Sequence, residues 1–139
     1  MRLVLDTDAV VAAMRSPSGA SAAILRLARA GKVQLLATVP LALEYEAVCS
    51  RPEHAEAAGL DAGEVQLFMD AVIAMTEPVS IWFLWRPQLR DPADELVLEA
   101  AVNGRADAIV GFNRRDYGSA PARFGMGYWL PSEALERVK

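Results

Sequence analysis

Short apolar runs alternate with longer helix-like segments along this chain, and the alternation strongly restricts how it can fold. Each run is long enough for one strand, and the runs cover residues 2–6, 33–38, 79–85, 107–111 and 126–130. The intervening segments carry helical apolar spacing or helix start and stop residues, and they cover 8–14, 21–30, 40–49, 63–75, 93–103 and a last helix from Pro131. Such alternation predicts a parallel sheet covered on both faces. We therefore predict an α/β fold with three α/β/α layers and a central, mainly parallel sheet of about five strands.

Size and composition fit one compact domain, which we expect to span residues 1–139. The chain is 53% hydrophobic, enough for a proper core. No apolar run reaches the ~20 residues that span a bilayer, so we expect a cytoplasmic protein without membrane contact. The single cysteine, Cys49, is expected to be a buried, inert thiol. The single histidine, His54, is expected on the surface of a polar loop or short helix that runs from Arg51 to Gly59.

Acidic residues stand at several of the predicted strand-to-helix junctions. Asp6 ends the first apolar run, Glu44 lies early in the helix after the second, and the others follow later strands: Asp91, Asp94 and Asp116, with Asn113 beside the last. In a parallel sheet with right-handed crossovers these junctions meet at one edge, so the acids can converge despite their distance in sequence.

Convergence has an electrostatic consequence. Two carboxylates ~4 Å apart repel by about 4 kcal/mol at an effective dielectric constant of 20. A divalent cation would remove that repulsion, and an all-oxygen site suits Mg²⁺ or Mn²⁺. Such an ion activates water and stabilises phosphoryl charge, so the acids point to phosphodiester chemistry. Individually, each acid also has a structural explanation: Asp91 as a helix cap, Asp94 as a first-turn acid, Glu44 as a solvated side chain, and Asp116 as an ion-pair partner of a neighbouring arginine.

The overall charge is compatible with such a site. The formal net charge of −4 argues mildly against a nucleic-acid partner, but the four proposed ligands would account for that entire deficit once a metal neutralises them. Twelve of the 14 basic residues are arginines, which suit bidentate phosphate contacts, although a GC-rich genome explains the same bias. Arg114 and Arg115 are candidate phosphate contacts beside Asn113.

The order and spacing of the acidic blocks resemble a PIN domain, the nuclease fold of VapC-like toxins from toxin–antitoxin systems. The blocks that carry this resemblance are residues 3–8, 43–48, 90–95 and 106–117, with a closing Pro131-Ser132-Glu133. Together they extend over nearly the whole chain, whereas none of them would be specific alone.

The resemblance implies an Mg²⁺- or Mn²⁺-dependent ribonuclease in which metal-activated water attacks phosphorus. It implies that the catalytic, metal-binding acids are Asp6, Glu44, Asp94 and Asp116, with Asp91 as an additional acid. It places Asn113 at a polar position near the metal. A cognate antitoxin and a homodimer are the protein partners it suggests.

Two positions depart from the family pattern. Asp8 stands where Asn is usual, which would add negative charge beside the site and makes it a further candidate ligand. Gly111 stands where Thr or Ser is common, so one hydroxyl group is missing.

Two other functions remain as alternatives. One is a PIN fold that only binds a partner and is catalytically silent. The other is a haloacid-dehalogenase-type phosphatase, in which Asp6 would be the nucleophile and Asp8 the general acid of a D-x-D motif. That mechanism needs a well-placed lysine, whereas Lys32 precedes its strand and Lys139 is terminal; Thr38 would supply its hydroxyl.

The aromatic run at residues 81–85 and the pair Tyr128-Trp129 are predicted to lie in the core. At a sheet edge, the run would instead offer a surface to a dimer partner or an antitoxin.

Overall fold

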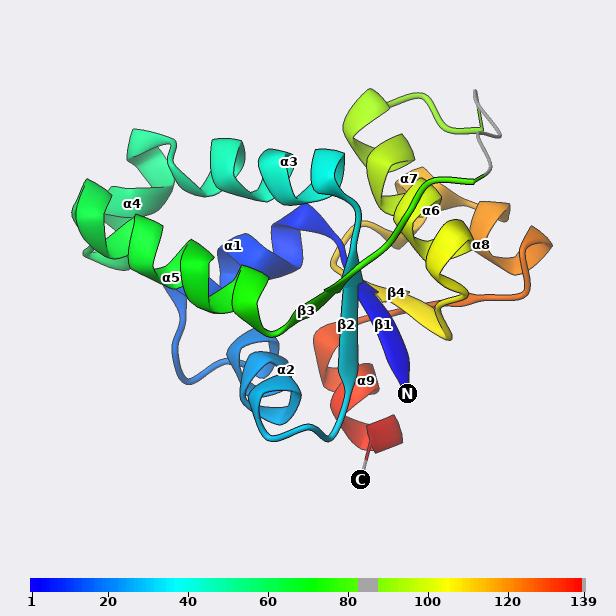
Figure 1. Ribbon diagram of the computed structural model, residues 1–139, viewed down its shortest axis with the longest axis horizontal. Coiled ribbons are helices and arrows are strands. Elements are labelled where there is room, and N and C mark those ends of the chain that lie inside the picture. Colours follow the sequence, from blue (N-terminus) through cyan, green and yellow to red (C-terminus); the bar gives the residue numbers. More distant parts are fainter. Residues whose placement is uncertain (83–87, 139) are drawn as a thin grey trace.

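A computed structural model describes residues 1–82 and 88–138. Its centre is a five-stranded sheet in which every pair of neighbouring strands is parallel (Figure 1). The strand order is β3-β2-β1-β4-β5, and the strands are β1 (Arg2–Leu5), β2 (Gln34–Ala37), β3 (Thr76–Pro78), β4 (Ala108–Val110) and β5 (Gly127–Trp129). The predicted α/β class and the parallel sheet of five strands are therefore confirmed.

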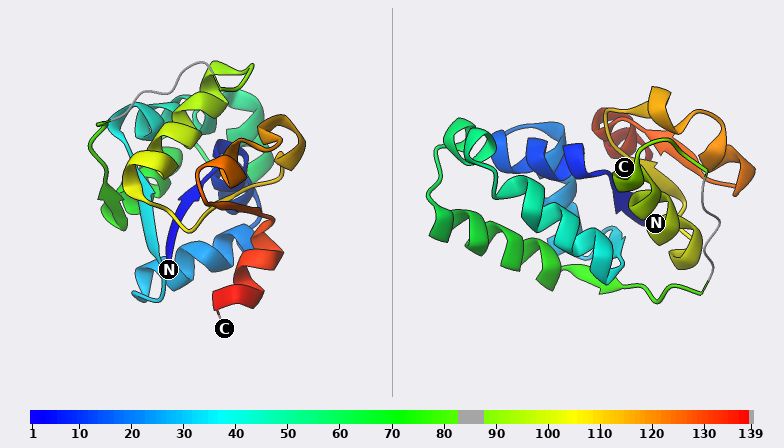
Figure 2. Two further views of the ribbon diagram at one scale, coloured as in Figure 1. Left: turned by 90° about the vertical axis from the view of Figure 1, so that its right-hand side faces the viewer. Right: turned by 90° about the horizontal axis from the view of Figure 1, so that it is seen from above.

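Helices cover both faces of the sheet. They are α1 (Thr7–Arg15), α2 (Ala20–Arg29), α3 (Val39–Cys49), α4 (Pro52–Ala58), α5 (Ala62–Ala74), α6 (Pro92–Gly104), α7 (Arg114–Tyr117), α8 (Ala120–Arg123) and α9 (Pro131–Val138). Strands β2 and β3 are added on one side of β1, and β4 and β5 on the other, so crossovers of one hand place helices on opposite faces. Accordingly, α6 contacts β1, β2 and β4, whereas α2 packs on α1 and α9. Figure 2 shows α4 and α5 extending to one side, away from α7 and α8.

Helix boundaries follow local chemistry that is visible in the sequence. The Thr38 hydroxyl accepts a hydrogen bond from the Leu41 N–H (3.2 Å) and caps α3, and Asp61 forms a capping box with Glu64 at the start of α5. Proline occupies a first-turn position in α3, α4 and α6, where its missing N–H costs no hydrogen bond. These signals explain why the starts of α3, α5 and α6 lie close to their predicted positions.

Of the two possibilities for residues 51–59, a loop or a short helix, the structure shows the helix: it is α4, followed by Gly59 in the left-handed conformation (φ 71°). Pro and Gly bracket a short helix as readily as a loop, because each is favoured at one end of a helix. The short helices α7 and α8 were not predicted, since four residues are too few to show a 3.6-residue period.

The third strand is also misplaced. It was predicted at 79–85 but is β3, which pairs with β2 through Leu35 and Thr76. The bond from the Val79 N–H to the Ala37 carbonyl (2.9 Å) is the last in this pairing, and residues 79–82 lie outside any strand. Within the aromatic run, Trp82 is 78% exposed rather than in the core, and residues 83–85 lie outside the described part of the chain.

The core surrounds the two central strands. Leu3, Val4, Ile109 and Val110 are all fully buried, and Cys49, the last residue of α3, is buried as expected. Burial raises the pKa of the Cys49 thiol to about 11, which keeps it protonated and inert. None of the helices in residues 1–82 and 88–138 has the length and apolar character needed to cross a bilayer.

Candidate functional site

The site lies where the strand order reverses, at the carboxyl ends of β1 and β4. Register pairs Leu5 with Val110, and the Asp6 N–H donates to the Val110 carbonyl (2.8 Å). Asp6 and Gly111 therefore leave the sheet side by side. In open α/β sheets this switch point is where ligands bind, because the two crossovers diverge to opposite faces and leave a crevice.

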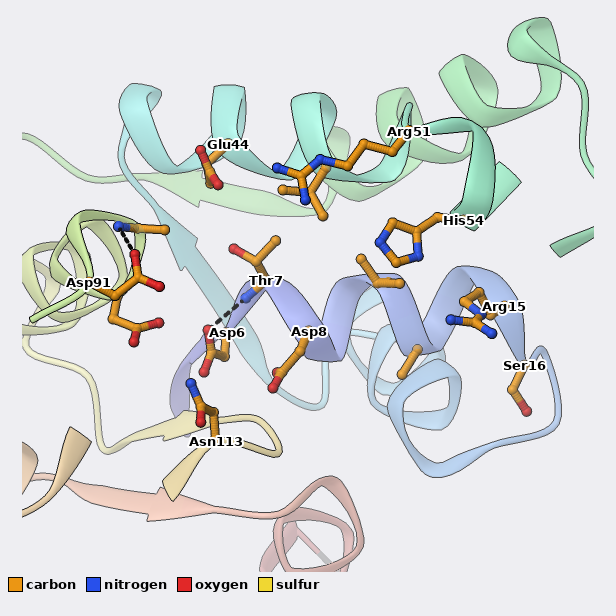
Figure 3. A pocket seen from close by; sticks show the side chains of 15 residues that line it. Asp6, Thr7, Asp8, Arg15, Ser16, Glu44, Arg51, His54, Asp91 and Asn113 are labelled. Carbon is orange, nitrogen blue, oxygen red and sulfur yellow. Dashed lines mark hydrogen bonds between the residues drawn. The ribbon is translucent and has the colours of Figure 1, made fainter. Parts of the chain in front are cut away.

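A cavity of about 760 Å³ opens at this crevice (Figure 3). Its polar lining at the sheet end consists of Asp6, Thr7, Asp8, Glu44, Asp91, Asp94 and Asn113. A neighbouring cavity of about 580 Å³ shares Asp91 and Asp94 and adds Arg115 and Asp116. The structure thus brings Asp6, Glu44 and Asp94 around one cavity, as expected from topology, and places Asp116 on the far side of Asp94 in the second.

Asp6 is held at both carboxylate oxygens. It is 4% exposed, its Oδ1 accepts from the Thr7 N–H (2.9 Å), and its Oδ2 accepts from the Tyr128 hydroxyl (2.7 Å). Burial raises the pKa of Asp6 above its usual value, and these hydrogen bonds oppose the rise only in part. The carboxylate is therefore oriented, and its charge is poorly solvated.

Asp94 is buried with one oxygen left over. Its Oδ1 lies 3.4 Å from the Tyr117 hydroxyl, whereas its Oδ2 is buried and has no hydrogen-bond partner among the residues described. Burial, followed by the charges of Asp6, Asp91 and Asp116, raises the pKa of Asp94 to about 7. A buried oxygen without a partner is costly, so this atom is suited to a proton or a cation.

Asp8 and Asp91 combine structural hydrogen bonds with positions in the cavity. The Asp8 oxygens accept from the Phe112 N–H (3.3 and 3.2 Å), which ties α1 to the segment after β4. Burial, followed by the charge of Asp6, raises the pKa of Asp8 to about 6. Asp91 is exposed and caps α6 by accepting a hydrogen bond from the Ala93 N–H (2.9 Å). It is therefore both the predicted helix cap and part of the cavity lining.

The donor set of the first cavity suits a divalent cation that keeps part of its water shell. Within the described residues, no three His, Cys, Asp or Glu side chains are grouped closely enough to hold a metal by direct ligation alone. Mg²⁺, however, usually keeps several waters and is bound through only one or two carboxylates. The all-oxygen lining, the unpartnered Asp94 Oδ2 and the raised pKa values of Asp6, Asp8 and Asp94 fit such a water-rich ion.

Tyr128 is a functional residue that sequence reasoning missed. It was assigned to the core, and it is only 9% exposed, yet its hydroxyl donates to Asp6 and accepts from the Asn113 N–H (2.8 Å). Its ring packs on that of Tyr117 with centroids 4.9 Å apart and the ring planes tilted by 43°, so two adjacent tyrosines reach the two buried acids. The 122 residues between Asp6 and Tyr128 hide this contact from any local pattern.

Gly111 explains how Tyr128 reaches the site. A Cβ atom at this position would lie 2.5 Å from the Asp6 Cβ and 2.9 Å from Asp8 Oδ1, and it would overlap the Tyr128 hydroxyl. The glycine therefore makes room for a tyrosine hydroxyl beside Asp6. A glycine at the end of a buried strand, flanked by site residues, was the one signal available in the sequence.

The candidate phosphate contacts after β4 separate into different environments. The Arg114 guanidinium donates to the Tyr128 carbonyl (3.0 Å) and pairs with Glu133 (2.5 Å), which joins this segment to α9. Arg114 lines neither cavity, because that pairing holds its side chain elsewhere. Arg115 is exposed beside Asp116 in the second cavity, but no ion pair joins them or links Asp116 to Arg114 among the described residues.

The phosphatase alternative finds no support in the geometry. Thr38 is 1% exposed and its hydroxyl caps α3, whereas Lys32 lines a separate groove between α2 and α9. Lys139 lies outside the described residues. Neither Thr38 nor Lys32 borders the cavity that contains Asp6.

The far half of the first cavity contains groups that were not predicted to belong to the site. His54, expected on the surface, is half-buried on α4 and faces the cavity together with Arg15 and Arg51. The segment of α4 was expected to be a loop or a short helix and follows no predicted strand directly, so its contribution to the site was not anticipated.

Comparison with known families gives a match over most of the chain. The family model described as PIN domain matches residues 2–115, which covers β1 to the start of α7 and includes every acid of the first cavity. Comparison with curated proteins gives no match, and neither does comparison with solved structures.

Proposed function

The chain belongs to the PIN-domain family, and from this premise we propose that it is a metal-dependent ribonuclease, the toxin of a toxin–antitoxin pair. PIN domains are generally nucleases that act on nucleic acid, and they typically use divalent metals. The finer proposal names RNA as the substrate, Mg²⁺ or Mn²⁺ as the cofactor, and hydrolysis of a phosphodiester bond by water as the reaction.

The observation that carries the proposal is the pair of buried acids at the switch point. Asp6 and Asp94 are 4% and 7% exposed and border the same cavity, and Asp94 Oδ2 has no partner among the described residues. Burying two carboxylates side by side opposes folding unless a cation or a proton compensates. A site with this arrangement is better explained by metal binding than by packing.

The proposed roles follow from the position of each side chain. Asp6, Glu44 and Asp94 would hold the cation, Asp8 and Asp91 would add negative charge around it, and Asp116 would act from the neighbouring cavity. When bound, the ion lowers the pKa of water and offsets charge on the phosphoryl group. Tyr128 and the Thr7 N–H orient Asp6, and Asn113 offers an amide to the substrate at the cavity wall.

The decisive test is cleavage of single-stranded and structured RNA by the wild type and by Asp6→Asn, with Mg²⁺ or Mn²⁺ and with EDTA. We expect metal-dependent cleavage that Asp6→Asn abolishes. Glu56→Gln, which removes an exposed acid of α4 outside both cavities, is the matched control and should cleave normally. Equal cleavage by Asp6→Asn and the wild type would refute the proposal. If the metal-loaded protein binds RNA but does not cut it, the alternative of a catalytically silent binding module is favoured instead.

The toxin role is tested in cells. Expression should arrest growth, Asp6→Asn should not, and co-expression of a cognate antitoxin should restore growth. A surface for that antitoxin, or for a second copy of this chain, is supported by the apolar residues Ile81 and Trp82, which are 38% and 78% exposed. Growth unaffected by the active enzyme would favour a housekeeping nuclease.

A further inference from the structure

The first cavity extends well beyond the acids, and its far end is basic. Arg15 and Ser16 at the end of α1 line it, and so do Arg51 and His54 at the start of α4. Between the two ends, the lining is apolar and consists of Val11, Ala12 and Val48. One continuous cavity therefore has an acidic end, an apolar middle and a basic end.

Helix α1 spaces the two ends. Asp8 and Arg15 both face the cavity and are seven residues apart, which is two helical turns or roughly 10 Å at 1.5 Å per residue. That spacing is too long for both ends to hold the oxygens of a single phosphate group. A ligand that uses both ends must carry a second anionic group.

The basic end is not engaged by the protein itself. Within residues 1–82 and 88–138, neither the Arg15 nor the Arg51 side chain makes a hydrogen bond or an ion pair. Figure 3 shows the Arg51 side chain running back along α3 towards Glu44, so that its guanidinium lies between the acids and His54. The buried Nδ1 of His54 also has no hydrogen-bond partner in the described part of the chain.

These groups match the chemistry of a nucleic-acid backbone. Guanidinium groups bind phosphate through parallel N–H donors, and the imidazole adds a further hydrogen-bonding group. The volume of about 760 Å³ lies within the roughly 300–1,000 Å³ typical of ligand pockets, so there is room for a nucleoside over Val11 and Val48.

We infer that Arg15, Arg51 and His54 form a second subsite, which binds backbone phosphates of the strand next to the phosphate at the acids. This inference rests on the proposed function only for the identity of the strand as RNA. Its physical basis, the basic side chains that line the cavity, does not depend on that function. The acidic end would position the phosphate to be cut, and the basic end would hold the same strand further along.

The test measures binding without cleavage. A fluorescent single-stranded oligoribonucleotide is titrated in EDTA, by anisotropy, with the wild type and with the double variant Arg15→Gln/Arg51→Gln. The matched control is Arg29→Gln/Lys32→Gln, which removes the same charge from exposed residues outside this cavity. We expect at least about tenfold weaker binding for the cavity variant, and a salt dependence (log K against log [salt]) whose slope is smaller by about 1.4, or about 0.7 for each lost phosphate contact.

Further measurements keep the outcome specific. In the cleavage assay with metal, the cavity variant should raise KM with little change in kcat, and Arg51→Lys should restore part of the affinity. His54→Gln should weaken binding by a smaller factor. Thermal unfolding checks that each variant is folded, which is expected because both arginines are exposed.

The result distinguishes this inference from the proposed function. If the cavity and control variants have equal affinities and equal salt slopes, the subsite is refuted even when Asp6→Asn abolishes cleavage. If the wild type never cleaves RNA but the cavity variant loses affinity and salt dependence, the subsite stands and the catalytic proposal fails.

Discussion

The two ends of the cavity differ in how their side chains are held. At the acidic end, Asp6 and Asp94 are buried, each is contacted by the hydroxyl of one of two adjacent tyrosines, and Asp6 accepts hydrogen bonds at both oxygens. At the basic end, Arg15 and Arg51 are exposed and make no ion pair with any described residue. Groups that act on a reacting phosphate need a preset geometry, whereas groups that hold a flexible strand can adjust to it. Changes at the acidic end should therefore cost catalysis, and changes at the basic end should cost affinity.

The largest effect is expected for Asp94→Asn. Loss of groups that merely support metal ligands already costs about 10–100-fold, so loss of this buried carboxylate should lower the cleavage rate by more than about 100-fold. Asp116→Asn is the matched comparison, because Asp116 is exposed and borders only the second cavity. Single-turnover cleavage with saturating metal measures the rate of each variant. Equal losses of rate would show that the acids of the two cavities contribute equally to cleavage.

Tyr128→Phe should come next. It removes the hydroxyl that donates to Asp6 and accepts from the Asn113 N–H, and we expect metal affinity to fall by about 10–100-fold. Calorimetric titration with Mn²⁺ measures the affinity directly. Tyr117→Phe, whose hydroxyl lies 3.4 Å from Asp94, should have a smaller effect. If Tyr128→Phe lowers stability but leaves metal affinity unchanged, Tyr128 contributes to packing and does not position Asp6 for metal binding.

Gly111→Ala tests the crowding at the acidic end through stability. The added Cβ would approach the Asp6 Cβ to 2.5 Å, and such overpacking should lower the free energy of unfolding by about 1–3 kcal/mol. Gly63→Ala is the control: its Cβ meets only Asp61 Oδ1 at 3.4 Å, and helix propensity should raise stability by up to about 1 kcal/mol. Urea unfolding measures both. A neutral Gly111→Ala would show that the Tyr128 hydroxyl is not tightly seated.

The smallest effect is a pH dependence of stability in the metal-free protein. The pKa values of Asp94 and Asp8, about 7 and about 6, are raised from 3.8, so the folded state binds these protons more tightly than the unfolded state. The free energy of unfolding should therefore fall between pH 4 and pH 7, by of order 1 kcal/mol because water screens part of the site. Urea unfolding in EDTA measures this loss. Asp94→Asn should flatten it, and metal should restore stability at pH 7.5; parallel pH curves for the variant and the wild type would contradict the assignment.

Much of the architecture could be predicted from the sequence because its signals are local. Apolar runs, caps such as Asp61 and first-turn prolines act within a few residues, so most helices and the parallel sheet were anticipated. The short helices α7 and α8 were not, and the segment of α4 was left open between a loop and a short helix, since such short segments offer too little periodicity. The third strand was misplaced because a hydrophobic run resembled a strand more than the residues that actually pair with β2.

The α/β order, the acids at the junctions and the resemblance to the PIN family can be recognised in the sequence alone, because they rest on short local motifs and on their order along the chain. Only the tertiary structure decided which acids border the same cavity, that Arg114 is engaged by Glu133, and that Tyr128 reaches Asp6. It also decided that Arg15, Arg51 and His54 complete the cavity that begins at Asp6. These contacts join residues far apart in the chain, and their geometry is set by how α1, α4 and β5 pack rather than by any neighbouring residue.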